Sequence, residues 1–168
     1  LATRRLFEAL GYRVELADPG CCARAMISTG LLDHARRTID ATIHRLGRWI
    51  DDERVKAILV AEPSCLSAIK DDWRQLRLSA PADRRELLAE RCFLPEDFAD
   101  RAWESHPVRP DPVAVIRRAR AVAPEGVLLH GHCHQKALWG IRTSGNLLER
   151  LFGDGLRTLD TGCCGMAG

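Results

Sequence analysis

Several features that mark common protein classes are missing from this sequence. No apolar run approaches the roughly 20 residues that a membrane-spanning helix needs. Residues 1–10 are charged and helical in pattern, without the apolar stretch of a secretion signal. Acidic and basic residues nearly balance, with a formal net charge of +2, so the charge gives no reason to expect nucleic acid as a partner. We therefore expect a soluble, cytoplasmic protein.

The common catalytic patterns are missing too. The sequence has no paired-carboxylate arrangement, no Gly-rich phosphate loop and no Ser-His-Asp pattern above chance, so the catalytic residues stay unknown. It also lacks the paired C-x2-C knuckles of many structural zinc sites. Any metal site must therefore use cysteines at other spacings.

The length of 168 residues fits one globular domain. The chain begins at Leu1 without a methionine and ends on Cys-Cys-Gly-Met-Ala-Gly, which has the composition of a functional turn. We therefore expect a fragment that is truncated at both ends.

Seven cysteines are the most unusual part of the composition. A chain without a secretion signal, and long enough to bury its own core, is not expected to use them as a disulfide framework. Metal binding or redox chemistry is the remaining role for these cysteines. Cys92, on a helical pattern, is the exception and is expected to be a plain buried or half-buried thiol.

Two pairs of adjacent cysteines, Cys21–Cys22 and Cys163–Cys164, each follow a glycine. Adjacent side chains in a strand point to opposite faces, so both thiols reach one object only where the backbone bends sharply. Glycine permits that bend. One pair alone could be two small buried hydrophobes or a vicinal disulfide, but the repetition of the pair favours a binding role.

Hydrophobic periodicity predicts strands that alternate with helices. The predicted strands are residues 12–17, 56–61, 126–131 and 156–160. The predicted helices are about residues 2–10, 23–50 with an interruption near Gly30, 66–76, 81–103 in two pieces broken near Pro95, 111–122 and 146–152. This order indicates an α/β fold with a mainly parallel sheet and flanking helices. Every cysteine except Cys92 then lies just past the C-terminal end of a strand, where the sites of such sheets collect.

An internal repeat divides the predicted fold into two halves. Residues 5–13 match residues 150–157 with one residue skipped, and each match is followed by a strand, a glycine and a Cys-Cys pair. We predict pseudo-repeated halves at about residues 1–80 and 124–168, joined by a helical linker at about 81–123. Each half would lack one cysteine, from opposite ends of the chain. The two predicted cysteine sets are Cys21, Cys22 and Cys65 in the first half and Cys133, Cys163 and Cys164 in the second.

Thiolates bind soft or borderline metals, notably zinc, copper(I) and iron–sulfur clusters. Four sulfurs that converge from strand ends suit a tetrahedral zinc site or a cluster, and the missing C-x2-C knuckles favour the cluster. Cys65 is predicted in the first turn of a helix capped by Ser64, where backbone amides favour a thiolate.

Three histidines alternate around Cys133, and on a regular strand they would share one face. His132 or His134 is the better candidate for a metal ligand or for a hydrogen bond to sulfur, and His130 the weaker one. The remaining histidines have no motif partners, and we expect them at the surface: His34, His44 and His106.

Three segments around these cysteines resemble a known family. They are residues 62–65 (Glu-Pro-Ser-Cys), 130–137 (His-Gly-His-Cys-His-Gln-Lys-Ala) and 160–168 (Asp-Thr-Gly-Cys-Cys-Gly-Met-Ala-Gly). Together they resemble the cysteine-rich CCG domain, and most closely the C-terminal iron–sulfur region of FAD-linked oxidases of the D-lactate dehydrogenase and glycolate oxidase kind. The likeness spans nearly the whole chain. More distantly, the chain resembles the CCG subunit of heterodisulfide reductase.

The resemblance implies an iron–sulfur-binding, electron-transferring region of an FAD-linked 2-hydroxy-acid oxidoreductase, with a cluster of the 4Fe-4S type. FAD would lie on another domain or subunit, with ferredoxin-type domains beside it, and this fragment alone would not be catalytic. A membrane quinone or cytochrome would accept the electrons, which places the protein in the cytoplasm or at the inner face of the membrane. The ligands carried over by position are Cys21, Cys22, Cys65, Cys133, Cys163 and Cys164.

Two other functions fit the same residues. A zinc-stabilised or metal-free module could dock the oxidase on a membrane acceptor, and a thiol-based redox protein could act through the vicinal pairs. One residue departs from the family pattern. Where the family has Cys-Cys-Gly, the first half has Cys21-Cys22-Ala23, and Ala23 adds a methyl group where close approach matters.

Overall fold

The fold is known from a computed structural model, which describes residues 1–163. The chain forms two compact units. One is Glu15–Leu94, and the other combines Leu1–Val14 with the residues from Pro95 onward. Each unit contains helices and a short parallel sheet, so the predicted α/β class with flanking helices is confirmed.

The Glu15–Leu94 unit is mostly helical. Its elements are α2 (Arg24–Ser28), α3 (Leu32–Ile50), β1 (Ile58–Leu59), α4 (Pro63–Ser67), the π-helical η1 (Ala68–Asp72), α5 (Trp73–Gln75), α6 (Ala82–Arg91) and β2 (Cys92–Phe93). Strand β1 pairs in parallel with β2, and Ile58 lies opposite Cys92. The segments α4, η1 and α5 follow one another without a break, so the predicted single helix contains one stretch of wider π turns.

The core of this unit follows the amphipathic pattern of α3. Ile39, Ile43 and Ile50 recur on one face of α3 and are almost completely buried. Trp73 and Leu88 are buried to the same degree, and α3 and η1 both pack against α6. Burial of these side chains stabilises the unit, at about 1.5–3 kcal/mol for each large apolar side chain.

Asp40, on α3, holds the loop that precedes α6. Its carboxylate accepts hydrogen bonds from the backbone amides of Ser79 and Ala80, all at 3.0 Å. Burial raises the pKa of Asp40, but these bonds favour the charged form and outweigh it, so the pKa lies below its ordinary value.

Replacing Asp40 with asparagine is expected to lower the free energy of unfolding by about 1–2 kcal/mol, because a charged acceptor is lost from these amides. A lowered carboxyl pKa stabilises the fold above the ordinary value of 3.8, and this contribution is lost as the pH falls through the folded-state pKa. Urea denaturation at pH 7 and at pH 3 measures both effects. Asp33, an exposed acid on α3, serves as the control, and an equal loss in Asp33→Asn would contradict the assignment.

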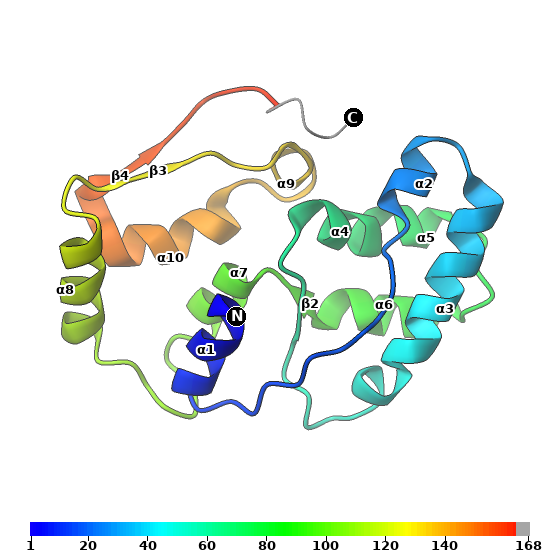
Figure 1. The fold of residues 1–168 in the computed structure, drawn as a ribbon, viewed down its shortest axis with the longest axis horizontal. Helices are drawn as coiled ribbons and strands as arrows, with labels where there is room; N and C mark the ends of the chain where they lie inside the picture. The colour runs from blue at the N-terminus through cyan, green and yellow to red at the C-terminus, as the bar shows by residue number, and fades with distance from the viewer. Residues whose placement is uncertain (164–168) are drawn as a thin grey trace. The chain divides into compact units, whose positions relative to one another are not determined.

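The other unit is built around a second parallel pair. Its elements are α1 (Ala2–Ala9), α7 (Pro95–Arg101), α8 (Pro112–Val122), β3 (Val127–Leu129), α9 (Cys133–Leu138), α10 (Arg142–Phe152), the 3-10 turn η2 (Gly153–Gly155) and β4 (Leu156–Thr158). Strands β3 and β4 run side by side and in parallel, with α10 next to them (Figure 1). Gly126 precedes β3 with φ +86°, and its α-carbon lies so close to the backbone of Gly155 that no side chain fits there.

An aromatic cluster in this unit corrects one prediction from the sequence. His106 was expected at the surface, but it is only 5% exposed. Its Nδ1 lies 3.1 Å from the Tyr12 hydroxyl and its Nε2 lies 3.0 Å from the Ala99 carbonyl oxygen. Phe7 and Phe98 pack around the pair, with ring centroids 5.7 Å apart. The fold therefore supplies His106 with hydrogen-bond partners that no sequence motif indicated. His34 and His44 are exposed, as predicted.

The predicted elements were largely right, with two errors in the strands. Residues 12–17 were predicted as a strand and form none, although the alternation of half-buried Tyr12 and Val14 with exposed neighbours is real. The boundary between the two units falls inside this segment, and the segment has no strand partner among the described residues. Cys92 was predicted on a helix, but that helix ends at Arg91 and Cys92 begins β2. It is buried, as expected.

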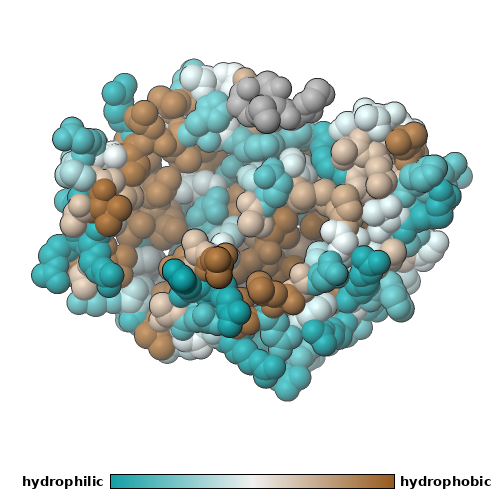
Figure 2. Space-filling model, in the orientation of Figure 1, coloured by the Kyte–Doolittle hydropathy of each residue, from teal (hydrophilic) through white to brown (hydrophobic). Residues whose placement is uncertain are grey.

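One region of the surface exposes apolar side chains. On the face shown in Figure 2, hydrophobic residues gather over the region of β3, β4 and α10, and Leu128 of β3 is 65% exposed. Within residues 1–163, no helix combines the length and the apolar character that crossing a membrane requires.

Candidate functional site

The Cys21–Cys22 pair lies on a sharp turn. Gly20 has φ +91° on one side of the pair and Ala23 has φ +60° on the other. Both angles lie in the left-handed region, which reverses the course of the backbone. The guanidinium group of Arg45 also lies against Gly20, in the space that a side chain would fill. Gly20 is therefore favoured by its φ angle, whereas the flexible end of the Arg45 side chain could move aside for a small side chain.

The backbone and the surroundings of Ala23 explain how an alanine fits where the CCG pattern that the chain resembles has a glycine. It is the one residue other than glycine with a positive φ among the described residues, and the left-handed conformation costs an alanine about 1–2 kcal/mol. Its side chain is fully buried, and burial of a methyl group returns about 0.8 kcal/mol. Glycine is the natural residue at this position because of the backbone angle, and alanine is tolerated because its methyl group is packed.

Two side chains fix the backbone of the turn. Thr42 of α3 donates a hydrogen bond from its hydroxyl to the Cys21 carbonyl oxygen, at 2.9 Å. The indole Nε1 of Trp73, the first residue of α5, donates to the Cys22 carbonyl oxygen at 3.0 Å. Because both bonds use backbone carbonyls, they hold the turn and leave the two thiols for other contacts. No motif in the sequence pointed to Thr42 or Trp73.

The two thiols of the turn diverge. The Cys22 thiol donates a hydrogen bond to the sulfur of Cys65, with 2.9 Å between the sulfurs. Cys21 is exposed, and its sulfur accepts a bond from the Ala23 amide at 3.3 Å. The fold therefore brings Cys22 and Cys65 together across 43 residues of sequence.

Cys65 sits in the first turn of α4, but its cap and its charge differ from the prediction. The cap is Glu62, whose carboxylate accepts bonds from the Ser64 amide at 3.2 Å and the Ser64 hydroxyl at 2.9 Å. Burial, followed by the hydrogen bond with Cys22, raises the pKa of Cys65 to about 12. The position was predicted to favour a thiolate. Burial outweighs the amides of this short helix, so the thiol stays protonated at neutral pH.

Cys133 begins α9, and the histidines around it do not lie on a strand. His132 is the N-cap of α9, and its Nδ1 accepts a hydrogen bond from the His134 amide at 3.3 Å. The His132 and His134 rings stack, with centroids 5.5 Å apart. The three histidines therefore do not share one strand face, because β3 ends at Leu129.

Thr161 holds the segment that leads from β4 to Cys163. Its hydroxyl lies 2.6 Å from Nδ1 of His130, and its carbonyl oxygen accepts a hydrogen bond from the Lys136 ammonium group. This anchoring brings Cys163 to Cys133, and their hydrogen bond, together with burial, raises the pKa of Cys133. Cys164, the remaining predicted ligand, lies outside the described residues.

A chain of buried polar groups fixes α9 against α10 and α7. The Gln135 amide nitrogen donates to the hydroxyls of Thr143, at 3.0 Å, and Ser144, at 2.7 Å. Ser144 in turn donates to Glu96 at 2.6 Å. Gln135 and Ser144 are only 3% and 6% exposed. Gln135 follows Cys133 by two residues on the same short helix. These hydrogen bonds therefore determine the position of Cys133 at the start of α9.

Replacing Gln135 with leucine is expected to lower the free energy of unfolding by about 1–3 kcal/mol, because the hydroxyls of half-buried Thr143 and buried Ser144 each lose a donor. Alkylation of Cys133 should become faster than in the parent chain. Urea denaturation and mass spectrometry of alkylated peptides measure the two effects. Asn146→Leu, at an exposed amide of α10, should change neither. Unaltered Cys133 reactivity in Gln135→Leu would contradict the positioning role.

The donor set suits a soft metal, but only in part. Within the described part of the chain, no group of three or more Cys, His, Asp or Glu side chains is placed to hold a metal ion. The predicted sets come together as two pairs, Cys22 with Cys65 and Cys133 with Cys163. In a tetrahedral zinc site, with Zn–S near 2.3 Å, two ligating sulfurs lie about 3.8 Å apart. The Cys22 and Cys65 sulfurs would have to move about 1 Å further apart to bind one metal ion in this geometry. The Cys21 side chain would have to turn toward them.

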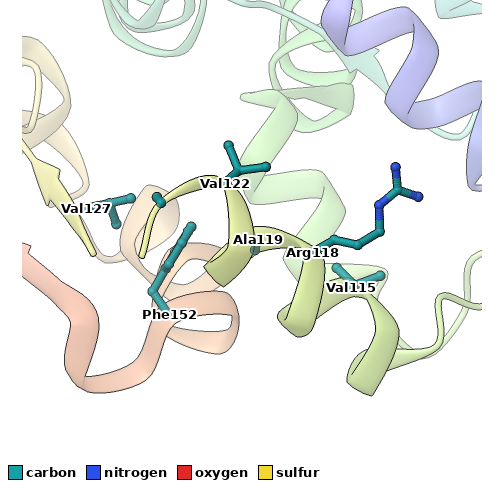
Figure 3. Close-up of a pocket in the computed structure, with 7 residues that line it drawn as sticks. Val115, Arg118, Ala119, Val122, Val127 and Phe152 are labelled. Carbon is teal, nitrogen blue, oxygen red and sulfur yellow. The ribbon is translucent and has the colours of Figure 1, made fainter. Parts of the chain in front are cut away.

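A hollow of about 550 Å³ lies beside α8 (Figure 3). Val115, Val122, Val127 and Phe152 line it, and Arg118 lies at its edge and extends away from Phe152. No cysteine or histidine contributes to its wall. The hollow therefore has no part in the chemistry of the candidate site.

Comparison with known proteins locates one family likeness. Residues 1–70 match the family model named CCG and described as a cysteine-rich domain, which confirms the predicted resemblance to this domain. The matched segment contains Cys21, Cys22 and Cys65, which belong to the turn and helix start described above. No curated protein and no solved structure matches the chain significantly.

Proposed function

We propose that this chain, in which residues 1–70 match the cysteine-rich CCG family, binds an iron–sulfur cluster through its cysteines and transfers electrons. The approach of Cys22 to Cys65 carries the proposal. Two thiols from distant parts of the sequence meet at 2.9 Å, within the segment that matches the family. Thiolates are the ligands of iron–sulfur clusters, which supply one-electron transfer when bound.

The residues around this pair have separate tasks in the proposal. Cys22 and Cys65 are the first ligands, and Cys21 is the next sulfur in the sequence. Thr42 and Trp73 hold the turn by its carbonyls, so that metal binding moves sulfurs and not the backbone. Because the raised pKa keeps Cys65 protonated at neutral pH, metal uptake must release its proton. Uptake should therefore become tighter as the pH rises.

The predicted internal repeat extends the proposal to a second set of cysteines. Cys133, Cys163 and Cys164 would form the second ligand set, with His132 or His134 near it. The hydrogen bond between Cys133 and Cys163 supports the first two members.

The finer proposal concerns the protein in which this chain works. By its resemblance to FAD-linked oxidases of the D-lactate dehydrogenase and glycolate oxidase kind, the chain is the electron-transferring region of a 2-hydroxy-acid oxidoreductase. FAD-binding and ferredoxin-type domains would pass electrons to it, and a quinone or cytochrome at the inner face of the membrane would receive them. In this arrangement the chemistry on the substrate takes place at the flavin, and this chain supplies the electron path.

Metal analysis of the chain tests the central claim. Anaerobically purified protein is expected to contain iron and acid-labile sulfide, and Cys22→Ser and Cys65→Ser should each lose at least half of both. Cys92→Ser is the matched control, because Cys92 is a buried thiol outside both predicted sets. Stoichiometric zinc without sulfide would refute the cluster and support a zinc-stabilised docking module. Absence of every metal would refute both.

A separate experiment tests the finer proposal. The native protein that contains this chain, purified with its bound partners, is expected to hold FAD and to reduce a quinone analogue with D-lactate or glycolate. Absence of flavin would contradict the oxidoreductase setting and leave the metal result intact.

A further inference from the structure

The thiols of Cys22 and Cys65 are placed for a second chemistry that needs no metal. Both cysteines are free and half-buried, and their sulfurs lie 2.9 Å apart. A disulfide bond has a sulfur–sulfur distance of about 2.05 Å, so the sulfurs need to approach by only about 0.9 Å. The Cys22 backbone is already fixed by Trp73 and the Cys65 backbone by α4.

The other thiols of this unit are poorly placed for the same reaction. Cys21 and Cys22 are adjacent, with α-carbons about 3.8 Å apart across a trans peptide, below the range of about 4.4–6.8 Å that disulfides use. The Cys21 sulfur is also bonded to the Ala23 amide. Cys92 is completely buried in β2, opposite Ile58. The geometry therefore selects one pair.

We propose that Cys22 and Cys65 form a reversible disulfide whenever the site holds no metal, with a low-molecular-weight disulfide such as glutathione disulfide as the oxidant. The Cys22 thiolate attacks one sulfur of the oxidant, and the first molecule of glutathione leaves. The Cys65 sulfur then attacks the Cys22 sulfur of this mixed disulfide and displaces the second. The protein loses two electrons and two protons, and the oxidant gains them as two thiols.

This disulfide makes metal occupancy and oxidation mutually exclusive. Both sulfurs that would ligate the metal are bonded to each other in the oxidised chain, and a disulfide sulfur is not a thiolate ligand. The site is thereby protected from the irreversible oxidation that an exposed thiolate undergoes. The inference concerns the metal-free chain and does not depend on which metal the site binds.

The test is an equilibrium oxidation of the whole chain. Metal-free, reduced protein is incubated without oxygen in mixtures of glutathione and glutathione disulfide, and free thiols are then blocked with N-ethylmaleimide. Equilibrium is the right readout because the reaction passes through a mixed disulfide, and the end point reports whether the protein disulfide forms. Trypsin releases residues 14–24, with Cys21 and Cys22, and residues 57–70, with Cys65. The expected result is a cross-link between these two peptides that dithiothreitol removes.

Three variants identify the bond. Cys21→Ser should keep the cross-link at a similar glutathione ratio, within about threefold, whereas Cys22→Ser and Cys65→Ser should abolish it. Circular dichroism of each reduced variant shows whether it has folded. A cross-link that survives in Cys22→Ser, a disulfide within residues 14–24, or only glutathione adducts at Cys22 would each overturn the proposal. Metal analysis of the reduced parent chain is independent of all these outcomes, so a failure here leaves the proposed function standing.

Discussion

Replacing Trp73 with alanine is expected to lower the free energy of unfolding by about 3–5 kcal/mol, among the largest effects of a single substitution in this chain. Trp73 is 1% exposed and is the largest of the fully buried side chains. Its removal leaves a cavity in the Glu15–Leu94 unit and also removes the donor that holds the Cys22 carbonyl. Urea denaturation followed by circular dichroism measures the loss.

The variant Trp73→Phe separates these two causes. Phenylalanine keeps most of the apolar volume and loses the indole N–H, so the half-buried Cys22 carbonyl loses its donor, at about 1–3 kcal/mol. Faster alkylation of Cys22 and Cys65 should accompany this loss. Trp49→Phe is the matched control, because its indole donates at 3.0 Å to the exposed carboxylate of Glu15. Equal losses in the two variants would show that the bond to Cys22 has no special weight.

The stability of the chain is expected to fall steeply in alkaline solution, because burial raises the pKa of Cys92 from its ordinary value of 9.0 to about 12. Between these values the unfolded chain has released a proton that the folded chain still holds. The free energy of unfolding therefore decreases as the pH rises through this window. By pH 10.5, Cys92 alone should account for a loss of about 2 kcal/mol relative to pH 7.

Cys92→Ala tests this assignment through the slope. The variant is expected to be less stable at neutral pH, because a buried sulfur is lost, but its stability should decline less between pH 9 and pH 10.5. Urea denaturation at several pH values gives both slopes. The raised pKa of Cys65 acts in the same direction, so part of the decline should persist. Parallel slopes for the parent and Cys92→Ala would contradict the role of Cys92.

The sequence was most informative where a local pattern and the fold agree. The periodicity of α3 predicted its buried face, and the apolar runs at β1, β3 and β4 predicted strands that the structure contains, although each is shorter. The Cys-Cys pair beside Gly20 predicted a sharp turn, which positive φ angles at Gly20 and Ala23 form. Such features depend on neighbours in the sequence.

Features that depend on distant partners were not predictable. Nothing near His106 in the sequence indicates the Tyr12 hydroxyl that it meets, 94 residues away. Cys65 has the sequence context of a thiolate, but burial by the fold decides its pKa. The approach of Cys22, and not Cys21, to Cys65 depends on side-chain directions that adjacency alone leaves open. The predicted strand ends indicated that these cysteines lie near one another. Which two sulfurs meet is shown by the structure.

The two carbonyl anchors on the Cys21–Cys22 turn have a thermodynamic consequence. Because Thr42 and Trp73 order this segment when the chain folds, its conformational entropy is lost then and is not lost again when a ligand binds. Ligand affinity and fold stability are thereby linked. A ligand held by these thiols should raise the melting temperature as its concentration increases, and a variant that loosens the anchors should weaken binding although every sulfur is still present.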